Sequence, residues 1–149
     1  MGHDYDYDQI YEGLYQGALP PTGTVLKDGG IDVLVLCAAE WQEALAYEGV
    51  EVICAPGEDD DRPRGLARFI DVWKDAARQV ATHQAHNKNV LVTCQQGWNR
   101  SGIVTALALQ ELTNQSGSAI VSHIQSCRQN ALCNQTFADY IVKSFPETK

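Results

Sequence analysis

The chain has 149 residues, of which 44% are hydrophobic and 20% are charged, and its formal net charge at pH 7 is −8. This length fits one domain over residues 1–149 with one buried core, and the composition is that of an ordinary globular protein. The acidic charge disfavours nucleic acid or a membrane surface as a partner, and no apolar run approaches the ~20 residues of a membrane-spanning helix.

The cysteines bear on the compartment and on cofactors. There are five of them, with no CxxC pair and no close Cys/His cluster, and the N-terminal segment lacks the basic-then-apolar pattern of a signal peptide. These features are typical of a cytoplasmic protein with reduced thiols, most of which are small core residues. We therefore expect a cytoplasmic location and neither a metal nor another cofactor.

The first part of the chain predicts a hairpin and two buried strands. Residues 9–20 alternate apolar and polar side chains around two glycines, which is typical of a short hairpin. Residues 29–39 are a turn followed by a solid Val/Leu/Ile run, the pattern of a strand buried on both faces. Residues 49–56 predict a second strand of this kind, ended by Pro56 and Gly57.

The rest of the chain has mainly the apolar spacing of helices, with one more buried strand among them. The predicted helices are residues 64–86, 101–113, 118–129 and 134–145, the predicted strand is residues 89–94, and the predicted N-caps are Ser118 and Asn134. Solid strands that alternate with helices predict a single-domain α/β fold. Its central, largely parallel, twisted sheet would have about four or five strands and be flanked by helices on both sides. In such sheets ligands bind at the carboxyl ends of the strands.

The segment VLVTCQQGWNRSG, residues 90–102, lies at such a carboxyl end. Cys94 ends the strand and Arg100 lies where the helix begins, so the loop between them meets the free N–H groups of the first helical turn. Gly97 and Gly102 allow close backbone approach, and the Arg100 guanidinium matches two oxygens of a phosphate. We therefore expect a phosphate-binding loop between a central strand and a helix, made by Gln95, Gln96, Gly97, Trp98, Asn99, Arg100 and Gly102.

Cys94 gains a chemical role from this position. The cradle that binds an anion also stabilises a thiolate, and a thiolate facing a bound phosphate is a nucleophile aimed at phosphorus. Ser101 can donate a hydrogen bond to the sulfur, which helps the thiolate to leave when a phosphocysteine breaks down. The alternative, a core thiol beside a surface arginine, does not account for the glycines and the serine in the same loop.

Cys94 to Ser101, CQQGWNRS, resembles the C-x5-R-S/T signature of the cysteine-dependent protein tyrosine phosphatases. The short chain looks like the compact dual-specificity branch, and its loop is similar to that of small bacterial or viral members. Three other segments are similar to parts of this family. The opening hairpin of the family is similar to residues 9–20, and the strand before its acid loop is similar to VEVICAPGED. The start of its late helix is similar to ALCNQTFADYI. The resemblance implies a phosphatase that works through a phosphocysteine. Thr93 departs from the family pattern, because most relatives have a histidine directly before the nucleophile.

The resemblance also implies a general acid, an aspartate in the loop after the preceding strand. A carboxylic acid on a mobile loop is suited to protonating the leaving oxygen. Here that loop is APGEDDDRP, and the phrase P-x-x-D favours Asp59. Asp60 fits the family spacing to Cys94 about as well, and Asp61 is the third candidate. At least one of the three carboxylates belongs to a solvated loop that caps the helix near Pro63.

Four further residues have a predicted place near the pocket. Trp98 either stacks on a substrate ring or packs against the protein. Asn99 has a scaffolding role through hydrogen bonds to its own loop or to neighbouring segments. Asn134 either only caps its helix or also lies near the pocket, and Glu40 is expected to orient Arg100 or another donor.

Three functions remain open at this point. The first is hydrolysis of phosphotyrosine, and also of phosphoserine or phosphothreonine, in a phosphorylated protein or peptide. The second is another phosphate substrate such as an RNA 5′-triphosphate, because GWNRSG is similar to the loop of RNA 5′-triphosphatases; the acidic net charge speaks against it. The third is a catalytically inactive phosphate-binding module, and the presence of Cys94, Arg100 and Ser101 speaks against that.

Overall fold

The computed structural model describes residues 5–38 and 43–147. The hairpin, the buried strands and the four long helices lie where the sequence predicts them, whereas the short elements α1 and η1, of four and three residues, were not predicted. In chain order the elements are β1 (Tyr7–Tyr11), β2 (Leu14–Gly17), α1 (Val25–Asp28), β3 (Val33–Ala38), the 3-10 helix η1 (Ala44–Ala46), β4 (Glu51–Gly57), α2 (Pro63–Ala85), β5 (Val90–Thr93), α3 (Arg100–Thr113), α4 (Gly117–Cys127) and α5 (Gln135–Ser144).

The strands form one five-stranded sheet in the order β1-β2-β5-β3-β4. β1 pairs antiparallel with β2, and the other neighbouring strands are parallel, so the predicted largely parallel sheet is confirmed. β5 is the central strand. Its last residue, Thr93, pairs with Gly17 of β2 and with Leu36 of β3. The carboxyl ends of three strands therefore meet where the chain leaves β5 for the loop at residues 94–99.

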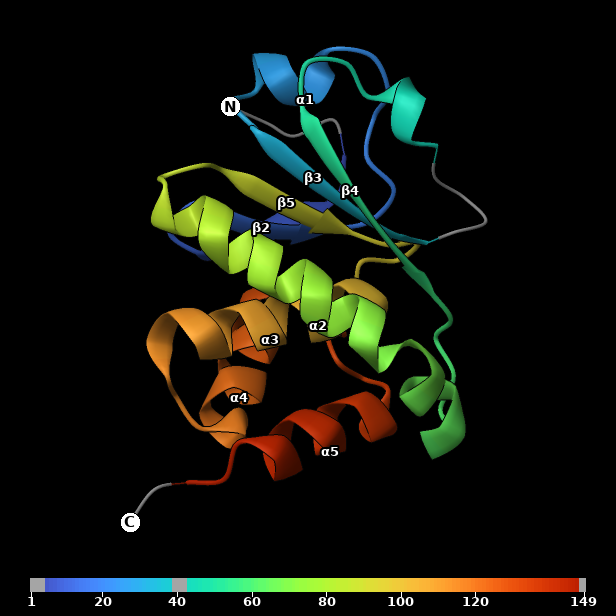
Figure 1. Cartoon of the computed structure of the whole chain (residues 1–149), viewed down its shortest axis with the longest axis vertical. Coiled ribbons are helices and arrows are strands. Elements are labelled where there is room, and N and C mark those ends of the chain that lie inside the picture. Colours follow the sequence, from blue (N-terminus) through green and yellow to red (C-terminus); the bar gives the residue numbers. More distant parts are fainter. Residues whose placement is uncertain (1–4, 39–42, 148–149) are drawn as a thin grey trace.

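The two faces of the sheet are covered unequally. The long helices α2, α3, α4 and α5 lie on one face (Figure 1), and α3 is the innermost of them, because it contacts β2, β3 and β5 as well as the other three. The other face carries α1, η1 and a smaller apolar cluster that includes Leu26, Leu34 and Tyr47. Helices are thus present on both sides, as predicted, but on the second side they are single turns. None of the helices in the described part of the chain is long and apolar enough to cross a membrane.

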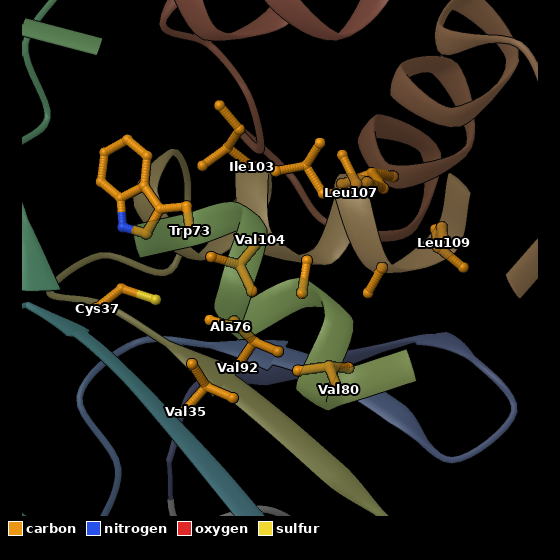
Figure 2. Close-up of a cluster of buried hydrophobic side chains, with 14 of the residues drawn as sticks. Val35, Cys37, Trp73, Ala76, Val80, Val92, Ile103, Val104, Leu107 and Leu109 are labelled. Carbon is orange, nitrogen blue, oxygen red and sulfur yellow. The ribbon is translucent and has the colours of Figure 1, made fainter. Parts of the chain in front are cut away.

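The main core lies between the sheet and the helices α2 and α3 (Figure 2). Val35 of β3 and Val92 of β5 are fully buried, as is Val80 of α2. Trp73 is also fully buried, and its indole Nε1 donates to the Ala55 carbonyl at 3.0 Å, so its polar atom is satisfied. Burial of each large apolar side chain stabilises the fold by about 1.5–3 kcal/mol. This packing fixes β5 and α3, the two elements that hold the ends of the loop.

The prediction of a strand buried on both faces is wrong for β4. Ile53, Ala55 and Gly57 are buried but the alternate residues are not, and Cys54 is exposed rather than a core thiol. The cause is the position of β4 at the edge of the sheet, where it has one neighbouring strand. An edge strand also tolerates proline, which has no N–H to donate, so β4 continues through Pro56 instead of ending there.

The two predicted helix caps have different outcomes. α4 begins at Gly117, and its N-cap is Ser116, whose Oγ accepts from the Ala119 N–H at 3.3 Å. The prediction of Ser118 as the cap is therefore wrong, because Ser118 already lies in the first helical turn. Asn134 is confirmed as the N-cap of α5, since its Oδ1 accepts from two N–H groups of the first turn at 3.1 and 3.4 Å.

Candidate active site

The loop at residues 94–99 has the strand–loop–helix arrangement that the sequence predicts. Cys94 follows β5 directly, and α3 begins at Arg100. Cys94 is 2% exposed, Arg100 is 6% exposed and Ser101 is fully buried. Three groups of very different chemistry are therefore held together below the surface, at the carboxyl edge of the central strand.

The Cys94 sulfur faces the first turn of α3. The Ser101 backbone N–H donates to Sγ at 3.4 Å, and the Ser101 Oγ lies 3.3 Å from it. Both groups can donate to a thiolate, and the positive end of the helix also favours negative charge there. Burial raises the pKa of the neighbouring Cys37 thiol, and Cys94 raises it further, whereas Arg100 lowers it. Cys37 therefore stays neutral and adds no second negative charge beside the sulfur.

Thr93, the residue directly before Cys94, is the position at which the sequence departs from the resemblance described above. Its Oγ1 donates to the Val35 carbonyl of β3 at 2.8 Å, and the side chain is fully buried. The hydroxyl thus links β5 to β3 at the end of the central strand. Thr93 therefore helps to fix the backbone from which Cys94 projects.

Two side chains from distant parts of the sequence hold carbonyl groups of the loop. Arg128, which follows α4, is 2% exposed; its Nη2 donates to the Gln96 carbonyl at 3.0 Å and its Nε to the Gly97 carbonyl at 2.7 Å. Gln16 of β2 is fully buried, and its Nε2 donates to the same Gly97 carbonyl at 2.9 Å. These carbonyl groups therefore point away from the inside of the loop.

The next carbonyl, that of Trp98, points outward as well, because it accepts from the Leu132 N–H at 2.9 Å. In a trans peptide the C=O and the following N–H point in opposite directions, and the described part of the chain contains no cis peptide bond. The N–H groups of Gly97, Trp98 and Asn99 therefore point toward the inside of the loop. Converging backbone N–H groups next to a helix N-terminus make a cradle for an anion.

Gly97 is the loop position at which the backbone requires a glycine. Its φ is +73°, and a Cβ there would overlap the backbone of Gly17 and Ala18, so the loop lies directly on the end of β2. At Gly102 a Cβ would meet Leu132 Cδ2 at 3.0 Å. This second glycine therefore allows the segment after α4 to close on the first turn of α3.

Arg100 lies between the loop and the end of β4. Its Nη1 donates to the Gly57 carbonyl at 3.2 Å, immediately before the acidic run at residues 58–61. The guanidinium is thus placed where the two loops meet. Glu40, which was expected to orient it, lies outside the described residues.

Asp59 is held against the 94–99 loop by two amide groups. Its Oδ2 accepts from Asn99 Nδ2 at 2.9 Å, and its Oδ1 accepts from Asn134 Nδ2 at 2.8 Å. The two asparagines are themselves joined, because the Asn134 N–H donates to Asn99 Oδ1 at 2.8 Å. Asn99 therefore has the scaffolding contacts expected of it, and Asn134 lies beside the pocket in addition to capping α5.

Asp60 has a different set of contacts. Its carboxylate accepts from the Arg62 N–H, Nε and Nη2 at 2.9, 3.0 and 2.9 Å, and it packs so closely on Gly65 that a Cβ there would overlap it. The hydrogen bonds from the Arg62 side chain, and then those from its backbone, lower the pKa of Asp60. Asp60 therefore stays ionised at the start of α2. Asp61 has an exposed side chain.

An open hollow of about 890 Å³ lies beside the 94–99 loop, and Asn99 is the loop residue that lines it. Gln95 and Gln96 are exposed and Trp98 is half-buried, so these three side chains can lie only at the rim of the cradle and not at its base. Within the described residues no group of three or more His, Cys, Asp or Glu side chains could hold a metal ion. The hollow is lined by Glu58, Asp59, Asp60, Asp61, Arg62, Asn99, Cys133, Asn134, Gln135 and Thr136.

Arg128 and Gln16 were not predicted to belong to the site. A signal for Arg128 exists in the sequence, because it is the one Asp, Glu, Lys or Arg in the predicted helix 118–129. A buried cation in an otherwise uncharged helix needs partners, and this is a reason to look for them. Gln16 gives a weaker signal, since a polar residue in a strand is usually exposed.

Comparison with known proteins gives one family and one fold. A sequence model described as protein-tyrosine phosphatase matches residues 53–143, which is more than half of the chain. A mouse putative dual specificity phosphatase complexed with zinc tungstate is 18% identical, with a TM-score of 0.76 over 97% of this chain and 91% of that one. Human DUSP28 is 17% identical, with a TM-score of 0.74 over 93% of each chain. Orf virus OH1, described as a tyrosine phosphatase with triple substrate specificity, is 18% identical, with a TM-score of 0.66 over 94% of this chain and 86% of that one. The search of curated protein sequences gives no match.

Proposed function

The chain belongs to the protein-tyrosine phosphatase family, and we propose that it hydrolyses phosphotyrosine, and also phosphoserine or phosphothreonine, through a phosphocysteine on Cys94. The family and the fold make it a cysteine-dependent protein tyrosine or dual-specificity phosphatase. The observation that carries the assignment of the nucleophile is the position of the Cys94 sulfur. It lies within 3.4 Å of two Ser101 donors, beside a loop whose N–H groups point inward.

Binding of the phosphate group falls to the loop and to Arg100. The inward N–H groups at Gly97, Trp98 and Asn99, with those at the start of α3, donate to the non-bridging oxygens. Arg100 adds a fixed positive charge at the same end of α3. These interactions strengthen as negative charge builds up on the oxygens in the transition state, so they lower the barrier and do more than bind the substrate.

The first chemical step is transfer of the phosphoryl group to sulfur. The Cys94 thiolate attacks phosphorus, a sulfur–phosphorus bond forms, and the bond from phosphorus to the substrate oxygen breaks. Asp59 gives a proton to that leaving oxygen, which departs as an alcohol or a phenol. The two amide groups that hold the Asp59 carboxyl use one acceptor site on each oxygen. Its proton can therefore still be directed at a substrate.

The second step regenerates the enzyme. Water attacks phosphorus, Asp59 accepts a proton from it, and the sulfur–phosphorus bond breaks to release inorganic phosphate and the Cys94 thiolate. The Ser101 hydroxyl and N–H stabilise the negative charge that returns to the sulfur. The same two donors that favour the thiolate in the free enzyme thus make it a better leaving group.

Asp59 is preferred over Asp60 as the general acid on two grounds. The Asn99 contact attaches Asp59 to the loop that binds the phosphate, whereas the Asp60 carboxylate is turned toward Arg62 and the start of α2. In addition, the hydrogen bonds from Arg62 lower the pKa of Asp60, which favours its ionised form and makes it a poorer proton donor. This supports the order of preference predicted from the sequence and adds a physical reason for it.

The surroundings of the cradle favour a protein or peptide substrate. The exposed rim residues Gln95 and Gln96 can contact an extended peptide, and the half-buried Trp98 offers an aromatic face for a phenol ring. The adjacent hollow contains the carboxylates of Glu58, Asp59, Asp60 and Asp61. These would repel the phosphates of an RNA 5′-triphosphate. All five cysteines are free thiols, which supports a cytoplasmic location.

Turnover of a panel of phosphate compounds tests this function. We expect hydrolysis of an aryl phosphate and of a phosphotyrosine peptide, with much weaker activity toward RNA 5′-triphosphate and phosphoinositides. An enzyme that prefers the RNA 5′-triphosphate would refute the assigned substrate class but not the chemistry. A protein that binds vanadate but hydrolyses none of these compounds would be an inactive binding module.

A further inference from the structure

Arg128 joins two parts of the molecule that are far apart in sequence. On one side its guanidinium donates to the carbonyls of Gln96 and Gly97 in the phosphate loop. On the other side Nη1 lies 2.9 Å from Asp6 Oδ1 and 2.9 Å from Asp8 Oδ2, and Nη2 lies 3.0 Å from Asp6 Oδ2. The Arg128 side chain is 2% exposed, whereas those of Asp6 and Asp8 are 67% and 44% exposed.

The two carboxylates determine what Arg128 can contribute. A buried charge without a partner is strongly destabilising, so Asp6 and Asp8 are what makes the burial of Arg128 tolerable. They also offset its positive charge, so little net attraction for a substrate phosphate remains. What Arg128 supplies is a planar set of directed N–H groups, which fix the positions of several acceptors at once.

The acceptors that matter here are two successive carbonyls of the loop. Without Arg128 the peptide between Gln96 and Gly97 loses the donor that holds its carbonyl outward, and a glycine lets such a peptide turn over. A reversed peptide removes an inward N–H and puts a carbonyl oxygen in its place. That oxygen would repel both the bound phosphate and the Cys94 thiolate. The Gly97 carbonyl is better protected, because Gln16 also donates to it.

We propose that Arg128, anchored by Asp6 and Asp8, is a positioning residue that holds the phosphate loop in its anion-binding form. The proposal rests on the proposed function of that loop and adds a source for its geometry. The directions of the loop N–H groups are set by residues 6–16 and 128–132, which are distant from the loop in sequence, in addition to the loop's own sequence. Arg128 acts through the backbone and does not touch the reacting atoms.

Two substitutions at this position test the proposal. Arg128→Met removes every donor but keeps a long side chain, and Arg128→Lys keeps the charge but not the planar set of donors. Arg78→Met is the matched control, since Arg78 is an exposed residue of α2 whose Nη2 lies 3.5 Å from Asp75. The measurements are kcat/KM with an aryl phosphate and the Kd of orthovanadate, both well below the Tm of each variant.

The expected results follow from the loss of one inward N–H group. Arg128→Met should lower kcat/KM by about 10²-fold, the scale of removing one donor to a transition-state oxygen. It should also weaken orthovanadate binding by about 10-fold, the scale of one hydrogen bond to a charged group. Arg128→Lys should lie between Arg128→Met and the wild type, and Arg78→Met should match the wild type. Folded Arg128 variants with normal kcat/KM and normal vanadate affinity would overturn the proposal.

A double substitution separates positioning from simple attraction. If Arg128 attracted phosphate by its charge, Asp6→Asn with Asp8→Asn would unmask that charge and tighten orthovanadate binding. If Arg128 is a positioning residue, the same change removes its anchors and weakens binding. Tighter binding in the double variant would therefore overturn the proposal, and weaker binding would support it.

Failure of the proposal is distinguishable from failure of the proposed function. If the wild-type protein binds orthovanadate but turns over no phosphate ester, only the proposed function is refuted. The orthovanadate affinity of the Arg128 variants then still tests the role of Arg128. If Arg128→Met does not fold, Gln16→Leu is measured in its place. Gln16 Oε1 has no hydrogen-bond partner among the described residues, so removing that oxygen costs little stability. Gln16→Leu should weaken vanadate binding by a few-fold. Normal binding in both Gln16→Leu and Arg128→Lys would overturn the proposal.

Discussion

Asp59→Asn removes the proposed proton donor from the loop that carries it. An asparagine side chain has one oxygen, so one of the two amide contacts at 2.9 and 2.8 Å is also lost, at a cost of about 1 kcal/mol in the docking of this loop. Loss of general acid catalysis should cost about 10²-fold in kcat with a poor leaving group, which corresponds to about 2.7 kcal/mol in the barrier. An aryl phosphate with a good leaving group needs little protonation, so its transfer to Cys94 should proceed at nearly the normal rate.

The assay is the pH–rate profile of each aspartate variant with the two kinds of leaving group. Asp59→Asn should flatten the alkaline limb, because that limb reports loss of the proton of the acid. Asp60→Asn and Asp61→Asn are the matched controls and should keep the limb, since Asp60 is already ionised through its contacts with Arg62. Asp59 is not the general acid if Asp60→Asn loses the limb and Asp59→Asn keeps it, or if all three variants keep it.

Four further predictions concern the loop and its surroundings. Cys94→Ser should lose turnover by several orders of magnitude but still bind orthovanadate. If it kept a tenth of the wild-type activity, Cys94 would be excluded as the nucleophile. Arg100→Lys should raise KM and lower kcat, because an ammonium cannot reproduce the guanidinium, whereas near-normal constants would contradict that role. Gly97→Ala should reduce the free energy of unfolding by about 1–3 kcal/mol and abolish vanadate binding, as measured by denaturant titration and calorimetry, since its φ of +73° and the adjacent backbone exclude a Cβ. Asp60→Asn should lower the Tm relative to the wild type at pH 7, and this difference should shrink below about pH 3.8, because a depressed pKa contributes stability that is lost as pH falls through the folded-state value. A Tm difference that does not change with pH would contradict the ion pair with Arg62.

The parts of the site that the sequence predicts are those held by local structure. Cys94, Arg100 and Ser101 follow one another through a strand end, a turn and a helix start, so their placement depends only on the loop and its two flanking elements. Asn134 was predicted as a cap for the same reason, since a cap bonds to the first turn of its own helix. Where local signals compete they fail, as at Ser118, because two nearby serines can each cap a helix.

The parts that the sequence does not predict depend on contacts between distant segments. Arg128 lies 31 residues from Gly97, and Gln16 lies 81 residues from it, so no spacing rule connects them to the loop. The choice between Asp59 and Asp60 depends on which one meets Asn99 and which one meets Arg62. That is decided by the packing of α5 and the start of α2 against the acid loop. Likewise, the exposure of Cys54 follows from the place of β4 at the sheet edge, which its apolar run does not reveal.

Trapping the covalent intermediate tests directly whether Cys94 is the nucleophile. The enzyme is mixed with a phosphotyrosine peptide, quenched in acid within the first turnover, digested, and examined by mass spectrometry for phosphate bound to sulfur. We expect phosphate on Cys94 in the wild-type enzyme and none in Cys94→Ser. Phosphate on another residue, or rapid turnover with no covalent phosphate at any time, would contradict the account.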